Sequence, residues 1–160
     1  MADISNRVQT RLWDENVDHV AYMNPQWKLV PKILSGEKPI ESRWYMTKRD
    51  PWDNIHPGDK VYFKDSGKPV TVQAEVANVR QFSGLNEERI RMILEEYGKQ
   101  IGIEDVEKSV EYYKGKKYCI LIFLRDPKQV EQPFEIDKKG FGSGTAWICV
   151  QNIDSIRKDL

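Results

Sequence analysis

Two segments of the chain alternate between apolar and polar side chains, and this alternation restricts the folds that the chain can adopt. The segments cover residues 40–47 and 69–79. A period of two residues is that of a β-strand with two different faces. The second segment follows a strand predicted at 60–64 and a turn at 65–68, so the two strands form a hairpin. We therefore expect a sheet whose strands are mostly antiparallel.

A first helix is predicted just before the alternating segment 40–47. Asn24 and Pro25 provide an N-cap and a first helical residue, and Gly36 ends the pattern. Pro31 interrupts the apolar spacing, so we expect a kink or two short helices.

Two more helices are predicted one after the other, at 86–97 and about 104–113. Asn86 caps the first of them, and Gly98 closes it. Shorter strands are predicted at 19–23, 118–124, 134–136 and 147–150, and a closing helical turn at 151–160. Strands grouped around an inserted helical pair indicate an α+β domain with a mixed, largely antiparallel barrel. We expect one domain at 18–160, preceded by a weakly ordered lead-in at 1–17.

The composition limits the classes of partner. The 160 residues carry 25 basic and 25 acidic side chains, unlike a uniformly basic nucleic-acid coat protein. Because the chain as a whole is neutral, any anionic partner has to meet a local patch. Residues 26–49 are a candidate, since they contain six basic and two acidic side chains, a net of +4. No apolar run approaches the roughly 20 residues of a membrane span, and the first 18 residues are polar, so we expect a cytoplasmic protein that does not bind membranes. His19 and His56 have no ligand partners at metal spacing, so neither a metal nor a cofactor is predicted.

The segment from Gly36 to Arg43 holds the candidate site. Lys38 lies in the turn after the first helix, and Glu41 and Arg43 are two residues apart on one strand face, roughly 6.5 to 7 Å from each other. Arginine offers a planar fork to phosphate, carboxylate or a base edge, whereas a desolvated lysine can act as a base or nucleophile. The alternative interpretation is an ion pair on a solvated strand face.

Two aromatic residues are candidate ligand contacts. Tyr45 shares the face of Glu41 and Arg43, and Trp52 lies in the polar loop 48–56, where it can stack on a base or pack over one end of the barrel. Three other tryptophans lie in apolar patterns and are predicted to belong to the core, namely Trp27, Trp44 and Trp147.

The spacing Gly36-x-Lys38-x-x-Glu41-x-Arg43 resembles the GxKxxExR signature of the ASCH family, a branch of the PUA-like superfamily. The resemblance extends to a turn with Ile55, Gly58 and Asp59, and covers roughly residues 19 to 125. It implies a small β-barrel with a cleft beside the motif. Family members are thought to bind RNA, and some act as hydrolases or nucleases.

One group of ASCH proteins removes the acetyl group from N4-acetylcytidine. The resemblance to this group implies a role for the motif lysine, here Lys38, and for a glutamate in the inserted helical region, for which Glu95 and Glu96 are candidates. This chain departs from the group at Glu41, where the group has a threonine, so the hydroxyl that its mechanism uses is missing.

We therefore expect a domain that binds RNA or a modified nucleotide or nucleoside in a cleft around the motif. The predicted ligand-binding residues are Lys38, Glu41, Arg43, Tyr45 and Trp52. The alternatives are a nucleoside or RNA hydrolase, either an N4-acetylcytidine amidohydrolase or a ribonuclease, with Lys38 and Glu41 as catalytic residues, and a protein-interaction barrel. The oligomeric state is not predicted.

Overall fold

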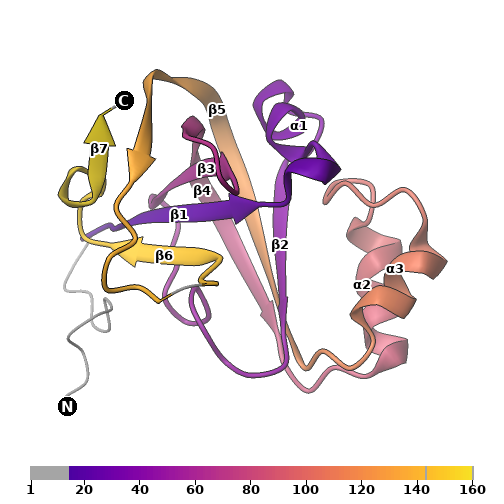
Figure 1. The fold of residues 1–160 in the computed structure, drawn as a ribbon. Coiled ribbons are helices and arrows are strands. Elements are labelled where there is room, and N and C mark those ends of the chain that lie inside the picture. Colours follow the sequence, from indigo (N-terminus) through magenta and orange to yellow (C-terminus); the bar gives the residue numbers. More distant parts are fainter. Residues whose placement is uncertain (1–14, 143, 160) are drawn as a thin grey trace, which may run out of the picture.

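A computed structural model describes residues 15–142 and 144–159, and these form one curled sheet with helices at one end (Figure 1). The strands are β1 (Asp18–Met23), β2 (Ile40–Tyr45), β3 (Lys60–Asp65), β4 (Val70–Phe82), β5 (Tyr118–Ile136), β6 (Trp147–Val150) and β7 (Arg157–Asp159). The α-helices are α1 (Leu29–Ser35), α2 (Glu87–Tyr97) and α3 (Val106–Tyr113), and the 3-10 helices are η2 (Pro25–Trp27) and η3 (Ile153–Ser155). The predicted lead-in falls mostly on residues 1–14, outside the described residues.

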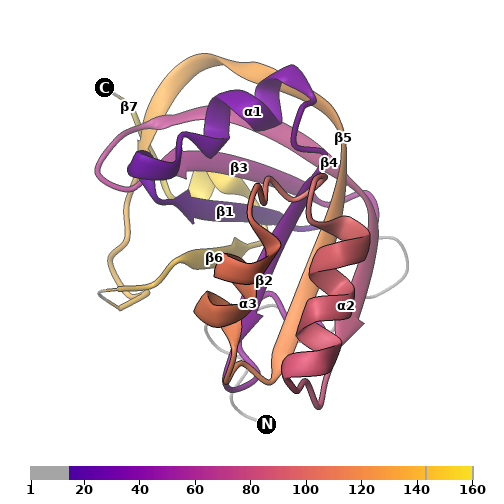
Figure 2. The same cartoon turned by 90° about the vertical axis from the view of Figure 1, so that its right-hand side faces the viewer.

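The sheet has the strand order β2-β5-β4-β3-β1-β6, and β7 pairs with β5 beside this path. β1 and β3 are parallel, and the other pairs are antiparallel. The predicted α+β class with a mixed, largely antiparallel sheet is confirmed, as a half-barrel in which β2 and β6 are the two ends of the order. α2 and α3 lie beside β2, at the opposite end of the molecule from β6 and β7, as Figures 1 and 2 show.

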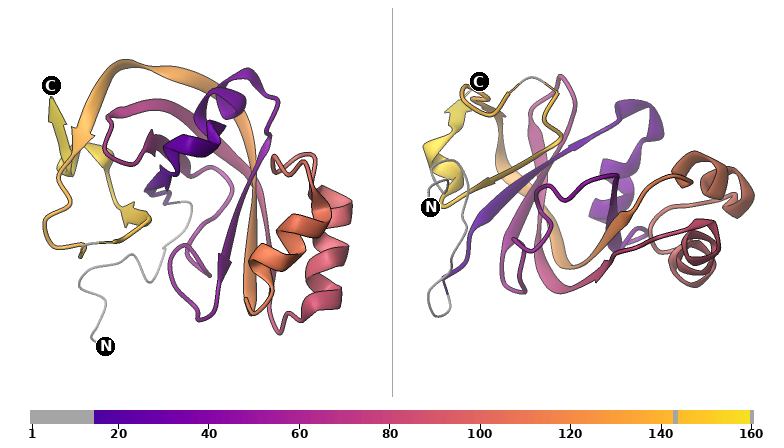
Figure 3. Two further views of the ribbon diagram at one scale, coloured as in Figure 1. Left: turned by 45° about the vertical axis from the view of Figure 1, so that its right-hand side comes forward. Right: turned by 90° about the horizontal axis from the view of Figure 1, so that it is seen from below.

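One long strand replaces two predicted short ones. β5 runs through residues 118–136 and pairs in turn with β2, β4 and β7. Three register shifts against β4 allow it to bend, and its curve over the half-barrel is visible in Figure 3. Its middle residues are largely exposed and polar, so they lack the alternation that would predict a strand. The predicted helical turn at 151–160 is also wrong in part, because η3 is followed by β7.

The first helix is broken, as expected, but at Lys28 and not at Pro31. Lys28 has a φ of 55°, in the left-handed region, and separates η2 from α1. Pro31 lies in the first turn of α1, where the helix requires no backbone N–H from it. Asn24 caps η2 by accepting a hydrogen bond from the N–H of Gln26 at 2.9 Å.

β2 buries both of its faces, and this arrangement positions the motif. Ile40 and Trp44 pack into an apolar cluster with α2 and α3, including Ile90 and Leu94, which are fully buried. Burying one such side chain stabilises the fold by roughly 1.5–3 kcal/mol. Glu41, Arg43 and Tyr45 alternate with these residues and lie on the other face, toward the inside of the half-barrel.

Two further features are absent from the described residues. No helix there is long and apolar enough to cross a membrane. In the same part of the chain, His, Cys, Asp and Glu side chains do not form any group of three or more that could hold a metal ion.

Candidate functional site

The turn between α1 and β2 carries Lys38 into the interior. Gly36 ends α1 with a φ of 85°, a left-handed conformation that side chains rarely adopt. The N–H of Lys38 then donates to the carbonyl of Lys32 at 2.9 Å, which fixes the return of the chain toward β2. The lysine side chain is consequently directed inward and is only 2 % exposed.

The Lys38 ammonium donates to three acceptors. They are the carbonyl oxygens of Ile40 at 2.7 Å and Ile101 at 3.0 Å, and Oε1 of Glu41 at 3.1 Å. Burial lowers the pKa of Lys38, and the charge of Glu41 partly offsets this effect. A protonated lysine has three N–H groups, so each can serve one of these acceptors. The Ile101 bond also ties the turn before β2 to the loop between α2 and α3.

Glu41 lies between the two cations of the motif. Its Oε1 faces Lys38, and its Oε2 accepts from Nε of Arg43 at 2.8 Å. Burial raises the pKa of Glu41, but the neighbouring positive charges of Lys38 and Arg43 outweigh burial and hold the pKa below its usual range. The carboxylate is therefore ionised at neutral pH, and its remaining lone pairs can accept hydrogen bonds.

Arg43 connects β2 with the other edge of the curled sheet. Its Nη2 donates to the Tyr22 carbonyl at 3.2 Å and to Sδ of Met23 at 3.4 Å, and its Nη1 donates to the Ala146 carbonyl at 3.3 Å. The guanidinium also lies 5.0 Å from the ring centroid of Trp147. Four of its five N–H groups thus have partners within the described residues, which leaves one on Nη1 for a ligand.

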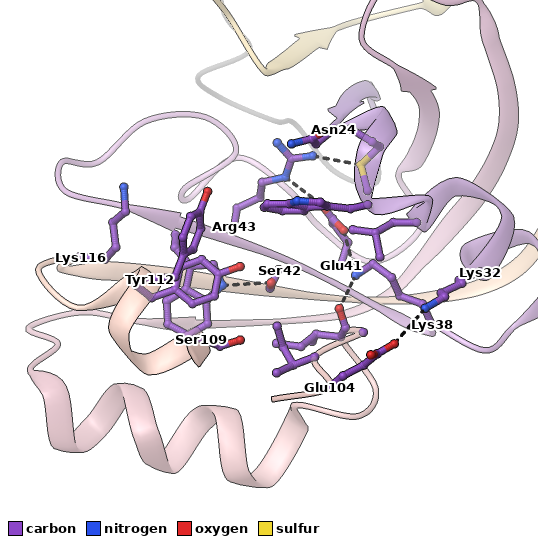
Figure 4. A pocket seen from close by; sticks show the side chains of 18 of the residues that line it. Asn24, Lys32, Lys38, Glu41, Ser42, Arg43, Glu104, Ser109, Tyr112 and Lys116 are labelled. Carbon is purple, nitrogen blue, oxygen red and sulfur yellow. Dashed lines mark hydrogen bonds and ion pairs between the residues drawn. The ribbon is translucent and has the colours of Figure 1, made fainter. Parts of the chain in front are cut away.

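These three side chains line a cleft of about 970 Å³. One wall comes from the end of β1, η2 and α1, and the other from residues 101–104 and α3, with β2 between them. Figure 4 shows Lys38, Glu41 and Arg43 joined in a row along this cleft. Among the described residues, the charged side chains that line it are five cations and two anions, namely Lys32, Lys38, Arg43, Lys108, Lys116, Glu41 and Glu104. The cleft is therefore electropositive, although the chain as a whole is neutral.

Two side-chain pairs span the cleft at its mouth. Lys32 of α1 faces Glu104 at 3.7 Å, with the glutamate 86 % exposed. Trp27 of η2 meets Tyr112 of α3 edge to face, with ring centroids 5.9 Å apart. The core location predicted for Trp27 is wrong, because 47 % of the residue is exposed. A continuous helix would have aligned Trp27 with the apolar residues that follow it, but Lys28 interrupts that helix.

The other predicted aromatic residues differ in their placement. Tyr45 lines the cleft, where its hydroxyl donates to the Asp50 carbonyl at 3.0 Å. Trp52 is not among the described residues that line the cleft, and it packs against the core and edge to face on Tyr118 at 5.0 Å. The packing alternative for Trp52 matches this placement, and its ligand role stays a prediction. Trp44 and Trp147 are buried, as predicted for core residues, although Trp44 also lines the cleft.

Sequence reasoning missed the polar and aromatic residues that α3 and the loops on either side of it bring to the cleft. They are Glu104, Lys108, Ser109, Tyr112 and Lys116. Lys108 and Tyr112 are four residues apart, which places them on one face of a helix and is the signal that could have found them. Glu95 and Glu96, the predicted third members of an amidohydrolase site, are exposed on α2 and are not among the described cleft residues.

Of three comparisons with known proteins, the one with solved structures shows the fold. No family model matches the chain, and no curated protein matches it. Among solved structures, the ASCH protein from Zymomonas mobilis superposes with a TM-score of 0.61 at 17 % identity, over 89 % of this chain and 96 % of that one. A mutant form of the same protein gives a TM-score of 0.60 at 18 % identity, over 83 % and 87 %.

The described part of the chain therefore has the fold of this ASCH protein, a curled, mostly antiparallel sheet with three α-helices at one end and a cleft beside β2.

Proposed function

We propose that the cleft binds a nucleic-acid strand or a modified nucleotide, with RNA as the expected ligand. The observation that carries the proposal is the lining of the cleft, which combines a positive charge excess with an exposed aromatic pair. The positive charge excess attracts phosphate groups, and aromatic rings can stack on bases. The likeness to an ASCH protein and the presence of Lys38, Glu41 and Arg43 in the lining of the cleft support the proposal.

Each part of the cleft has a role in this proposal. Lys32, Lys108 and Lys116 neutralise phosphates at the mouth, and Trp27 and Tyr112 offer ring faces to a base once they separate. Deeper in the cleft, Glu41 and Arg43 have the acceptor and donor capacity to contact a polar base edge or a ribose hydroxyl. Lys38 contributes charge and holds Glu41 in place, and Tyr45 forms part of the wall.

The contacts of the motif favour binding over hydrolysis. A hydrolase that uses Lys38 as a base or nucleophile requires a neutral amine, yet all three acceptors around Nζ require N–H donors. A Glu41 with a lowered pKa is also a weak base and is not protonated at neutral pH. Turnover of N4-acetylcytidine or of short RNAs, lost in Lys38→Ala, would contradict the binding proposal and favour the enzyme.

Salt dependence tests the proposal most simply. We expect the affinity for a labelled single-stranded RNA, measured by fluorescence anisotropy, to fall linearly on a log–log plot against salt. Each of Lys32→Gln, Lys108→Gln and Lys116→Gln removes one phosphate contact, so the slope decreases by about 0.7 per substitution. Lys68→Gln is the matched control, because Lys68 is exposed in the turn between β3 and β4 and does not line the cleft.

Three results would contradict the proposal. They are the absence of RNA binding, binding that does not respond to salt, and an equal slope change for Lys68→Gln and the cleft variants. Recovery of a protein partner without nucleic acid would instead favour the protein-interaction barrel.

A further inference from the structure

A hydrogen-bonded triad of side chains, Trp147, His19 and Asp59, lies in the core directly behind Arg43. The Trp147 ring, over which the guanidinium lies, donates its Nε1–H to Nδ1 of His19 at 3.0 Å. Nε2 of His19 is in turn 2.8 Å from Oδ2 of Asp59. His19 and Asp59 are completely buried, and Trp147 is 5 % exposed.

The indole N–H of Trp147 fixes the tautomer of His19 in this triad. An indole N–H can only donate, so Nδ1 of His19 has to accept, and the imidazole proton is on Nε2. His19 therefore donates to Asp59. Asp59 also accepts the backbone N–H groups of Val17 at 3.2 Å and His56 at 3.0 Å. The carboxylate thus accepts from His19 and from two backbone N–H groups, and the indole donor selects the His19 tautomer that donates to it.

Trp147 connects this triad with the cleft, because its ring contacts Arg43. Trp147 belongs to β6 and Arg43 to β2, the two ends of the strand order, and in the curled sheet the Arg43 side chain spans the gap between them. Among the described residues, the β6 side of this contact offers the carbonyl of Ala146 and the face of the Trp147 ring. The ring therefore supports the guanidinium on this side, while hydrogen bonds to Glu41, Tyr22 and Met23 hold it on the other.

We propose that Trp147, His19 and Asp59 are positioning residues for Arg43. Asp59 orients His19, His19 orients the indole ring, and the ring supports one side of the guanidinium, so that the hydrogen-bonded position of Arg43 and its remaining N–H are kept for the ligand. The inference rests on the proposed function in so far as the ligand is a nucleic acid. If the same three residues only pack in the core, the effect of substituting them will not depend on the presence of Arg43.

A double-mutant cycle distinguishes positioning from packing. Trp147→Phe keeps an aromatic ring under Arg43 but removes the donor to His19, and His19→Gln is a second variant that keeps the indole ring. Both are made in the native chain and in an Arg43→Gln background, and RNA affinity and urea midpoints are measured for all of them. Trp52→Phe is the matched control, since the Trp52 Nε1 has no hydrogen-bond partner among the described residues.

We expect Trp147→Phe to weaken RNA binding about fivefold in the native chain and less than about twofold in the Arg43→Gln background. We expect the shift of the urea midpoint to shrink in that background as well. An equal loss of RNA affinity in both backgrounds, or no loss in the native chain, overturns the inference. If Trp147→Phe does not fold, His19→Gln answers the same question. If no variant binds RNA, the proposed function fails, and the urea cycle alone decides whether the ring and the guanidinium are coupled.

Discussion

The inner and outer parts of the cleft hold their charges differently. The inner group, Lys38, Glu41 and Arg43, is nearly inaccessible to solvent, and its side chains are 2 %, 5 % and 11 % exposed. The outer pairs, Lys32–Glu104 and Trp27–Tyr112, span the mouth and are largely exposed. Buried charges that lose a partner are costly, whereas exposed pairs contribute little to stability. The inner group therefore shapes the cleft, and the outer pairs can separate to admit a ligand.

The largest effect is expected for Glu41→Gln. The substitution keeps the size of the side chain but leaves Lys38 and Arg43 as buried cations without a counter-charge, so the free energy of unfolding should fall by roughly 3–5 kcal/mol. Urea denaturation measures it. Glu37→Gln, an exposed residue of the same turn, is the control and should change stability by less than about 0.5 kcal/mol. A similar loss for both variants would contradict the distinction between the inner group and the surface.

Trp27→Ala is expected to show the opposite profile. Loss of a stacking face should weaken RNA binding by about 1–3 kcal/mol, while stability changes by less than about 1 kcal/mol, because almost half of the residue is already exposed. Anisotropy titrations and urea curves are compared for the same samples. Met92→Ala, which truncates an exposed apolar residue of α2, should leave binding unchanged. A large loss of stability with unchanged affinity would place Trp27 in the core after all.

Acid titration sharpens the comparison further. The pKa of Glu41 is held below its usual value by Lys38 and Arg43 despite the raising effect of burial. Its stabilising contribution is thus present above the unfolded-state pKa and is lost as the pH falls through the lower folded-state pKa. Thermal unfolding from about pH 5 downward should show a steeper loss for the native chain than for Glu41→Gln. Parallel curves would mean that Glu41 does not titrate differently in the two states.

The smallest effect is expected at the exposed ion pair. Glu104→Gln frees Lys32 from a carboxylate 3.7 Å away, and the free energy of unfolding should change by less than about 1 kcal/mol. RNA affinity should rise by about twofold, since the ligand no longer competes with Glu104 for Lys32 and one negative charge leaves the cleft. A drop in affinity would show that Glu104 contacts the ligand itself.

Local signals were sufficient to predict the inner group. The two-residue spacing of Glu41 and Arg43 places them on one strand face, and Gly36 ends the helix so that Lys38 can turn inward. Lys38 and Glu41 do form an ion pair, but a buried one, because the inserted loop covers them and Ile101 accepts a bond from the lysine. Sequence spacing alone does not reveal this burial.

Long-range contacts explain what the sequence could not predict. Trp27 lies in an apolar pattern, and its exposure follows from the break at Lys28 and from the approach of Tyr112 on α3. β5 is continuous because its backbone pairs with three strands, although its central side chains are polar. Such pairing depends on which strands meet, and no local pattern encodes it.

The central claim, that nucleic acid lies in the cleft between α1 and α3, can be tested by photo-cross-linking. A short RNA that carries a photoreactive base is irradiated with the protein, and the cross-linked peptides are identified by mass spectrometry. The account predicts adducts on peptides that contain Trp27 and Tyr112, lost on competition with unlabelled RNA. Competed adducts confined to peptides remote from this cleft, such as those that contain the exposed residues Lys60 and Gln132, would contradict it.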